Sequence, residues 1–253
     1  MASPTLAELV TAPHRSAANI ARNAARHPVE TLEFFGLQPN QTVLEILPAF
    51  GWYTEILAPY LAEHGRLYVA HFSPDGIASY MPAVLERFEE RMRRAPEIFG
   101  RVTVRHINPP RECTIAPPGT VDLAMTFRNV HNWIMAAQDD DYFAAFHKAL
   151  KPGGVLGVVE HRARPDATEE SMRTTGYVTQ ARVIELAERA GFVLEASSEI
   201  NANPLDHTQH PDGVWSLPPF LRSGDKERYL AIGESDRMTL RFRKPVAPAA
   251  GAH

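Results

Sequence analysis

Cysteine is almost absent from this chain, because Cys113 is the only one among 253 residues. A single cysteine cannot form an intrachain disulfide, so a disulfide framework is excluded and a reducing compartment is expected. The chain also lacks an excess of basic residues, since 26 lysines and arginines stand against 30 aspartates and glutamates, for a net charge of -4. Without a global basic field, nucleic acid is not an expected partner.

Long hydrophobic runs are missing as well. No apolar run approaches the roughly 20 residues that a membrane-spanning helix needs. The first residues also lack the basic and then apolar pattern of a secretory signal. We therefore expect a cytoplasmic protein with no membrane partner. A chain that begins after a removed secretory signal would look the same, so that alternative stays open.

Hydrophobic residues make up 44% of the chain, which is enough to bury a sizeable core. We expect one main domain with additions. The pattern of residues predicts an N-terminal helical extension over 1–40, a main domain over 41–244 and a disordered tail, rich in Pro and Ala, over 245–253.

Two kinds of apolar periodicity alternate along the main domain. Short apolar runs predict strands at 42–47, 66–72, 101–107, 121–127 and 155–160. Helical spacing predicts short helices within 13–35 and longer ones at 54–63, 77–99, 140–150 and 179–190. Strands that alternate with helices imply right-handed crossovers and a mainly parallel sheet with helices on both faces.

The end of the main domain departs from this alternation. Strand-like runs at 192–200 and 238–243 have no predicted helix between them, which indicates an antiparallel pair at one edge of the sheet. The segment 201–236 that joins them is rich in Pro and His. Connections of this length are uncommon, and we interpret this one as a lid that closes over a substrate. A surface loop packed by its own aromatic residues is the alternative.

The first predicted strand ends abruptly. From Val43 to Thr54 the chain passes from an apolar run with one acid, Glu45, through Pro48 and Gly51 into a helical stretch. A strand that turns tightly into a helix presents free backbone N–H groups and a positive dipole end at one place. In open α/β sheets the ligand crevice lies at the carboxyl ends of the strands. The sequence therefore predicts a small-ligand site at this turn.

The order of elements, with Lys-Pro-Gly-Gly at 151–154 before the fifth strand, resembles the class I S-adenosylmethionine-dependent methyltransferases. More narrowly, motifs at 45–48, 51–54, 127–133 and 233–237 look like a mostly uncharacterised bacterial group of predicted methyltransferases. They read Glu-Ile-Leu-Pro, Gly-Trp-Tyr-Thr, Phe-Arg-Asn-Val-His-Asn-Trp and Gly-Glu-Ser-Asp-Arg. The resemblance spans about 42–244. It implies a Rossmann-like, doubly wound α/β fold with a mainly parallel seven-stranded sheet, S-adenosylmethionine as cofactor and a small-molecule acceptor.

In the family that the chain resembles, an acid-x-Gly-x-Gly-x-Gly loop follows the first strand, and its acid helps to hold the amino-acid end of the cofactor. Here Glu45 stands at the acid and Gly51 at the last glycine, while Leu47 and Ala49 replace the first two. A Cβ where the backbone must approach a ligand or take a positive φ costs free energy, so these replacements could weaken or abolish cofactor binding. The resemblance implies a cofactor site formed by Glu45, Leu47, Pro48, Ala49, Phe50, Gly51, Tyr53, Thr54, His71, Phe72 and Asn129.

The second predicted strand ends in His71 and Phe72, where the family commonly has an acid that bonds the ribose hydroxyls. A neutral imidazole donates one hydrogen bond and accepts one, so His71 is a weaker candidate for the same contact. Asp75, a few residues later, is the alternative.

Three residues are candidates for the chemistry. His131 and His161 follow the fourth and fifth predicted strands and are expected at the carboxyl edge of the sheet, where either could act as the base for a hydroxyl acceptor. Arg128 could pair with a carboxylate of the cofactor or the substrate. Structural alternatives stay open: His131 fastening a loop together with Trp133, His161 in a solvated charged turn, and Arg128 in an ion pair with a neighbouring acid.

Two other functions compete with methyl transfer. The replacements at 47, 49 and 71 are compatible with a fold that binds the cofactor or another ligand without methyl transfer, as a lyase, an isomerase or a regulator. Asp206, His207, His210 and Asp212 suggest a metal site in the lid, although two histidines three residues apart in a loop are a weak zinc signal and we predict no metal. The oligomeric state is not predicted.

Overall fold

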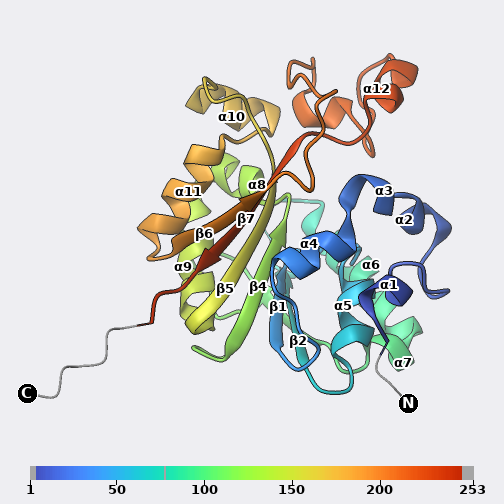
Figure 1. Cartoon of the computed structure of the whole chain (residues 1–253), viewed down its shortest axis with the longest axis vertical. Coiled ribbons are helices and arrows are strands. Elements are labelled where there is room, and N and C mark those ends of the chain that lie inside the picture. Colours follow the sequence, from blue (N-terminus) through green and yellow to red (C-terminus); the bar gives the residue numbers. More distant parts are fainter. Residues whose placement is uncertain (1–3, 77, 247–253) are drawn as a thin grey trace, which may run out of the picture.

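The computed structural model of the protein is a central sheet with helices packed on both faces (Figure 1). It describes residues 4–76 and 78–246. Most of the tail that we predict to be disordered, 247–253, lies outside the described residues, and so does Ile77 in the predicted helix 77–99.

The strand order in the sheet is β3-β2-β1-β4-β5-β7-β6. The strands are β1 (Thr42–Ile46), β2 (Arg66–Phe72), β3 (Thr103–Ile107), β4 (Val121–Phe127), β5 (Leu150–His161), β6 (Val193–Ser198) and β7 (Arg237–Arg243). β7 runs antiparallel to both of its neighbours, and the other neighbouring strands pair in parallel. The predicted Rossmann-like, mainly parallel seven-stranded sheet with a terminal antiparallel pair is confirmed.

Short helices precede the sheet and longer ones connect its strands. In chain order they are α1 (Leu6–Leu9), α2 (Ala17–Ala21), α3 (Asn23–Arg26), α4 (Pro28–Phe34), α5 (Thr54–Leu61), α6 (Met81–Arg94), α7 (Pro96–Phe99), α8 (Val130–Met135), α9 (Asp139–Ala149), α10 (Glu169–Thr175), α11 (Gln180–Arg189), the 3-10 helix η1 (Gly213–Ser216) and α12 (Lys226–Ile232). Among the described residues, no helix has the length and apolar character needed to cross a membrane.

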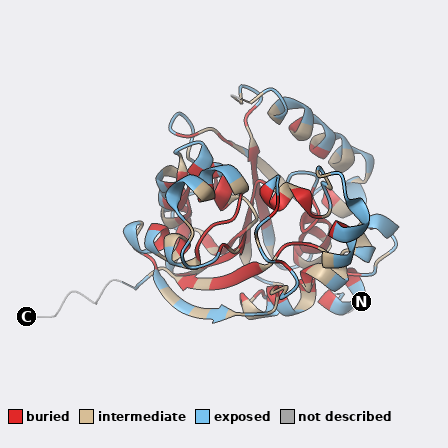
Figure 2. Ribbon diagram, turned by 90° about the horizontal axis from the view of Figure 1, so that it is seen from above, coloured by how far each residue is buried: buried red, intermediate tan, exposed pale blue. Residues whose placement is uncertain are grey.

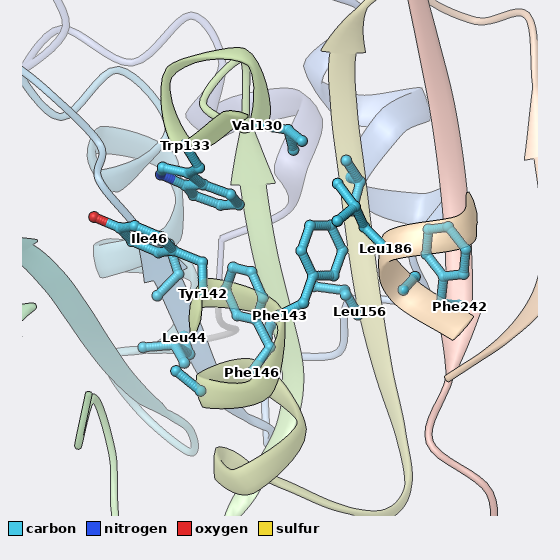
Figure 3. Packing of buried hydrophobic residues seen from close by; sticks show 14 of the residues in the cluster. Leu44, Ile46, Val130, Trp133, Tyr142, Phe143, Phe146, Leu156, Leu186 and Phe242 are labelled. Carbon is cyan, nitrogen blue, oxygen red and sulfur yellow. The ribbon is translucent and has the colours of Figure 1, made fainter. Parts of the chain in front are cut away.

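Two hydrophobic clusters cover the two faces of the sheet. Successive side chains of a strand point to opposite faces, so Leu44 and Ile46 join the cluster under α8, α9 and α11, whereas Val43 joins the cluster under α1, α4, α5 and α7. Figure 3 shows the first cluster, in which Trp133 and Phe143 pack over the strands. The buried residues run through the middle of the molecule, and the outer sides of the helices are exposed (Figure 2).

The structure departs from the predicted elements at a few places with clear physical causes. The predicted helix 77–99 begins at Met81 and is interrupted at Ala95, because the ring of Pro96 disfavours helical backbone in the preceding residue. The predicted turn 151–154 is part of β5, whose pairing with β4 shifts register between Val121 and Leu123. The short helices α8 and α10 and those within 201–236 were not predicted, because few residues carry their periodicity.

The carboxyl ends of the parallel strands meet at one edge of the sheet. There β4 leads into α8, and both α10 and α12 lie above this edge (Figure 1). The predicted lid over 201–236 therefore stands over the place where an open α/β sheet binds its ligands.

Candidate functional site

A cavity of about 740 Å³ opens at this edge of the sheet. Its volume falls within the range of small-molecule sites, roughly 300–1,000 Å³. Most of the predicted site residues line it, namely Glu45, Leu47, Pro48, Ala49, Phe50, Tyr53, Phe72, Arg128, Asn129, His131 and His161. Trp215 and Phe220, which belong to the predicted lid, line it as well. Other lining residues, which include Arg26, Trp52, Tyr80 and Arg222, were not among the predicted site residues.

The loop after β1 keeps the backbone conformation of a glycine loop without the glycines. Leu47 and Ala49 have φ values of 46° and 52°, and Gly51 has a φ of 80°. A non-glycine residue at such a φ costs on the order of 1–3 kcal/mol and persists only where its surroundings over-determine it. The backbone strain expected where Leu47 and Ala49 replace glycine is thus present in the structure.

Four hydrogen bonds from neighbouring elements hold this loop. The Leu47 N–H donates to the carbonyl of Ala70 at 2.8 Å. The Arg91 guanidinium donates to the carbonyl of Phe50 at 2.9 Å, and the Asn129 amide donates to the carbonyls of Ile46 at 3.1 Å and Leu47 at 3.4 Å. Asn129, predicted to contact the cofactor, therefore also supports the loop.

His71 supports the same loop from behind. Its Nδ1 accepts the Phe72 N–H at 2.8 Å, so the proton lies on Nε2, which donates to the carbonyl of Ala49 at 2.9 Å. Burial lowers the pKa of His71 to about 4, which keeps the ring neutral. Both ring nitrogens are occupied by backbone partners and the ring does not line the cavity, so His71 offers no free nitrogen for the expected ribose contact in this geometry. Gly51 and Thr54 also lie outside the lining.

Glu45 is a buried carboxyl at the end of β1. The Thr54 hydroxyl donates to its Oε2 at 2.6 Å. Burial raises the pKa of Glu45 to about 8, against the opposing effect of this hydrogen bond. A pKa raised in this way favours the protonated form of Glu45 near neutral pH, and a cation beside the carboxyl would favour the ionised form.

Glu160, at the end of β5, joins the two predicted bases. The carboxylate lies 2.9 Å from His131 Nδ1 and accepts the backbone N–H groups of His131 at 3.3 Å and His161 at 2.8 Å. Glu160 is fully buried, and the two imidazole rings lie 5.1 Å apart between centroids. Glu160 was not among the predicted site residues, although an acid beside His161 at the same sheet edge was a usable signal.

The two histidines differ in their surroundings. His161 Nδ1 lies 2.5 Å from the Ser235 hydroxyl. Burial holds the pKa of His161 well below its usual range, and the positive charges of Arg128 and further arginines act in the same direction. His161 is therefore a poor proton acceptor. His131 lines the cavity, and a carboxylate partner at its Nδ1 orients the ring, so the geometry favours His131 as the base.

The part of the chain that the structure describes contains only one group of three potential metal ligands. It consists of His131, Glu160 and His161, whose donor atoms lie within 4.8 Å of one another. The positive charges of Arg26, Arg128 and Arg237 act on this group and disfavour a cation there.

The lid residues that suggested a metal site have other partners. His210 Nε2 lies 2.8 Å from Asp206, while the carboxylate of Asp212 bonds to Ser223. His207 is exposed. The structure does not bring these residues together as a ligand set.

The lid is anchored through Asp206, a buried carboxylate. It accepts the Tyr177 hydroxyl at 2.8 Å and the backbone N–H groups of Thr208 and Asp236 at 2.8 Å. Further along the lid, the guanidinium of Arg222 stacks on Trp215 and Phe220, at 5.2 and 5.5 Å from the ring centroids. These three side chains line the cavity.

Comparisons of sequence identify no relatives: no family model matches the chain, and no curated protein matches it. Solved structures do share its fold. A SAM-dependent methyltransferase from Aquifex aeolicus is 15% identical, with a TM-score of 0.60, over 88% of this chain and 93% of its own. The geranyl diphosphate C-methyltransferase from Streptomyces coelicolor is 14% identical, with a TM-score of 0.58, over 93% and 87%. The cyclase SpnF is 16% identical, with a TM-score of 0.60, over 94% and 86%.

These likenesses concern the fold. The chain has the Rossmann-like fold of S-adenosylmethionine-dependent methyltransferases, as the resemblance implied. The narrower resemblance to one bacterial group stays a prediction.

Proposed function

We propose that the protein transfers the methyl group of S-adenosylmethionine to a small molecule. The observation that carries the proposal is the loop after β1, which keeps positive φ at Leu47, Ala49 and Gly51 and lines the cavity of about 740 Å³. Strain of this kind is concentrated at functional sites, where it presents backbone to a ligand. The likeness of the fold to methyltransferases supports the same proposal.

The residues of the cavity fit this cofactor. The loop 47–51 and Glu45 would hold its amino-acid end, because a buried carboxyl whose pKa is raised to about 8 gains a counter-ion from an amino group. Phe72, Tyr80 and Val84 form an apolar wall for an aromatic base. When bound, the cofactor supplies an electrophilic methyl group.

His131 would remove the proton of the acceptor. A carboxylate only accepts hydrogen bonds, so His131 Nδ1 carries its proton toward Glu160 and Nε2 is left free to accept another. Glu160 fixes the orientation of the ring and stabilises the imidazolium that forms, while Trp215, 6.1 Å away between centroids, helps to exclude water.

Methyl transfer can be tested with a panel of hydroxylated small molecules, by measuring the release of S-adenosylhomocysteine. We expect His131→Asn to lower the rate by about 10²–10⁴, the usual contribution of a general base, without weakening cofactor binding. His207→Asn, an exposed histidine of the lid, is the matched control. Full activity in His131→Asn contradicts the role of this residue.

The alternative is a protein that binds the cofactor or another ligand without methyl transfer. The cyclase SpnF shares the fold, so this arrangement of strands and helices is not confined to methyltransferases. Tight binding of S-adenosylmethionine with no product from any acceptor would favour this alternative.

A further inference from the structure

Arg26, at the end of α3, is a buried cation with an unused hydrogen-bonding edge. Its side chain lines the cavity, and the residue is only 3% exposed. Its guanidinium lies over the ring of Trp52, 4.6 Å from the centroid, and its Nε bonds to Glu234 at 3.3 Å. Its Nη2 is buried without a hydrogen-bond partner. An unsatisfied donor on a buried charged group costs free energy, which a ligand acceptor would recover.

Arg128, at the end of β4, is a second cation on the same cavity wall. It is half-buried, and no carboxylate of the described residues lies within ion-pair distance of it. Its backbone takes a φ of 60°, which is costly for an arginine, and its N–H donates to the carbonyl of Val159 at 2.7 Å. The fold thus keeps this side chain at the cavity, where the charges of Glu234 and Glu160 act on it but neither carboxylate forms a direct ion pair with it.

The charges around these two residues do not balance. Arg22, Arg26, Arg128 and Arg237 all act on one carboxylate, Glu234, and hold its pKa down at about 2. Nearby acids have other partners, since Asp236 pairs with Arg162 at 2.8 Å and Glu160 binds His131. Uncompensated buried charge is costly, and a guanidinium stays protonated in proteins, so the excess is positive.

This positive charge lies on the side of the predicted bases. Arg26, Arg128 and Arg237 lower the pKa of His161, whereas the pKa of Glu45 responds to burial and to Thr54 alone. Glu45, the carboxyl expected to hold the amino group of the cofactor, is therefore not paired with the arginine cluster.

We propose that Arg26 and Arg128 form an anion subsite, and that the acceptor molecule carries a carboxylate or a phosphate group which binds there. The guanidinium fork suits both groups, because it offers two parallel donors to two oxygen atoms. The inference rests on the proposed function, because it assigns the anion to the acceptor. The alternative is that Arg26 and Arg128 bind the carboxylate of the cofactor itself.

Calorimetry on protein saturated with S-adenosylhomocysteine tests the subsite. Benzoate and benzamide have the same shape and differ in charge, and inorganic phosphate is a second anionic probe. We expect wild-type protein to bind benzoate or phosphate at least about tenfold more tightly than benzamide, and Arg128→Gln to lose this preference. Arg128 has no ion pair to lose, so the variant should stay folded. Arg93→Gln, at an exposed arginine of α6, is the matched control and should keep the preference.

Each other outcome overturns part of the inference. A wild type that does not prefer the anions, or an Arg128→Gln variant that still does, refutes the subsite. If Arg128→Gln weakens S-adenosylhomocysteine but not 5′-methylthioadenosine, which lacks the amino-acid end, the anion belongs to the cofactor and the assignment to the acceptor is wrong. If the wild type prefers benzoate but binds neither nucleoside, the subsite stands and the proposed function fails.

Discussion

Two glycine substitutions in the strained loop after β1 should change the free energy of unfolding in opposite directions. Ala49 is exposed and has a φ of 52°, so Ala49→Gly removes no buried surface and relieves a left-handed conformation. That relief is worth about 1–2 kcal/mol, since the left-handed region costs a non-glycine residue that much. Against this, the variant loses about 0.4–1 kcal/mol of folding stability, because glycine gives the unfolded chain more conformational freedom. The net expectation is a stabilisation of about 0.5 kcal/mol.

Leu47→Gly should act in the opposite direction. Leu47 has a similar φ of 46° but is buried in the core beside α8. Removing a buried leucine side chain costs about 2–5 kcal/mol, which exceeds the relief of strain. With the same loss through the unfolded chain added, we expect a net destabilisation of about 1.5–4 kcal/mol.

Urea unfolding followed by tryptophan fluorescence gives both free energies, and calorimetry with S-adenosylhomocysteine gives the effect on binding. Ala49→Gly should bind the cofactor product as tightly as the wild type or more tightly, because a Cβ is removed from the loop. Destabilisation of Ala49→Gly by more than about 1 kcal/mol, or stabilisation of Leu47→Gly, would refute the account of this loop.

Three further predictions concern buried carboxyl groups. Glu160→Gln should lower the rate of methyl transfer by about 10²-fold or more without loss of fold, because His131 loses the carboxylate that stabilises its charged form; unchanged kcat contradicts this. Glu45 has a folded pKa of about 8, above its unfolded value, so the stability it contributes is present below about pH 4.5 and is lost as the pH rises toward 8. Urea unfolding between pH 5 and 8 should therefore show a flatter profile for Glu45→Gln than for the wild type, and parallel profiles would argue against a protonated Glu45. Glu234→Gln should lower the unfolding free energy by about 3–5 kcal/mol, because it leaves buried arginines without their carboxylate. The control Glu199→Gln, at an exposed surface ion pair, should lower it by less than about 1 kcal/mol. Equal losses in the two variants would contradict the buried cluster.

The sheet was predictable from the sequence because its strands are apolar runs of the right length between turn residues. The runs at 66–72 and 121–127 have the bounds of β2 and β4 without change. The insertion of β7 between β5 and β6 could not be read from the sequence, because neighbours in a sheet are set by long-range pairing. The end of α6 follows from a local feature of the sequence, because Pro96 disfavours helical backbone at Ala95.

The candidate site was predicted less completely. The resemblance located Glu45 and the loop after β1, and the positions of His131 and His161 after strands placed both histidines at the cavity. Arg26 lies far from these residues in the sequence, so no local pattern could connect it to them. The role of His71 depends on its two backbone partners, which only the folded structure reveals.

Calorimetric titration of the purified, folded protein with S-adenosylmethionine and S-adenosylhomocysteine tests the central claim most directly. The account predicts binding of both compounds at one site per chain with micromolar affinity, weakened by substitution of Glu45. No heat with either compound, from protein that unfolds cooperatively in urea, would contradict the claim and would point to a different ligand in this cavity.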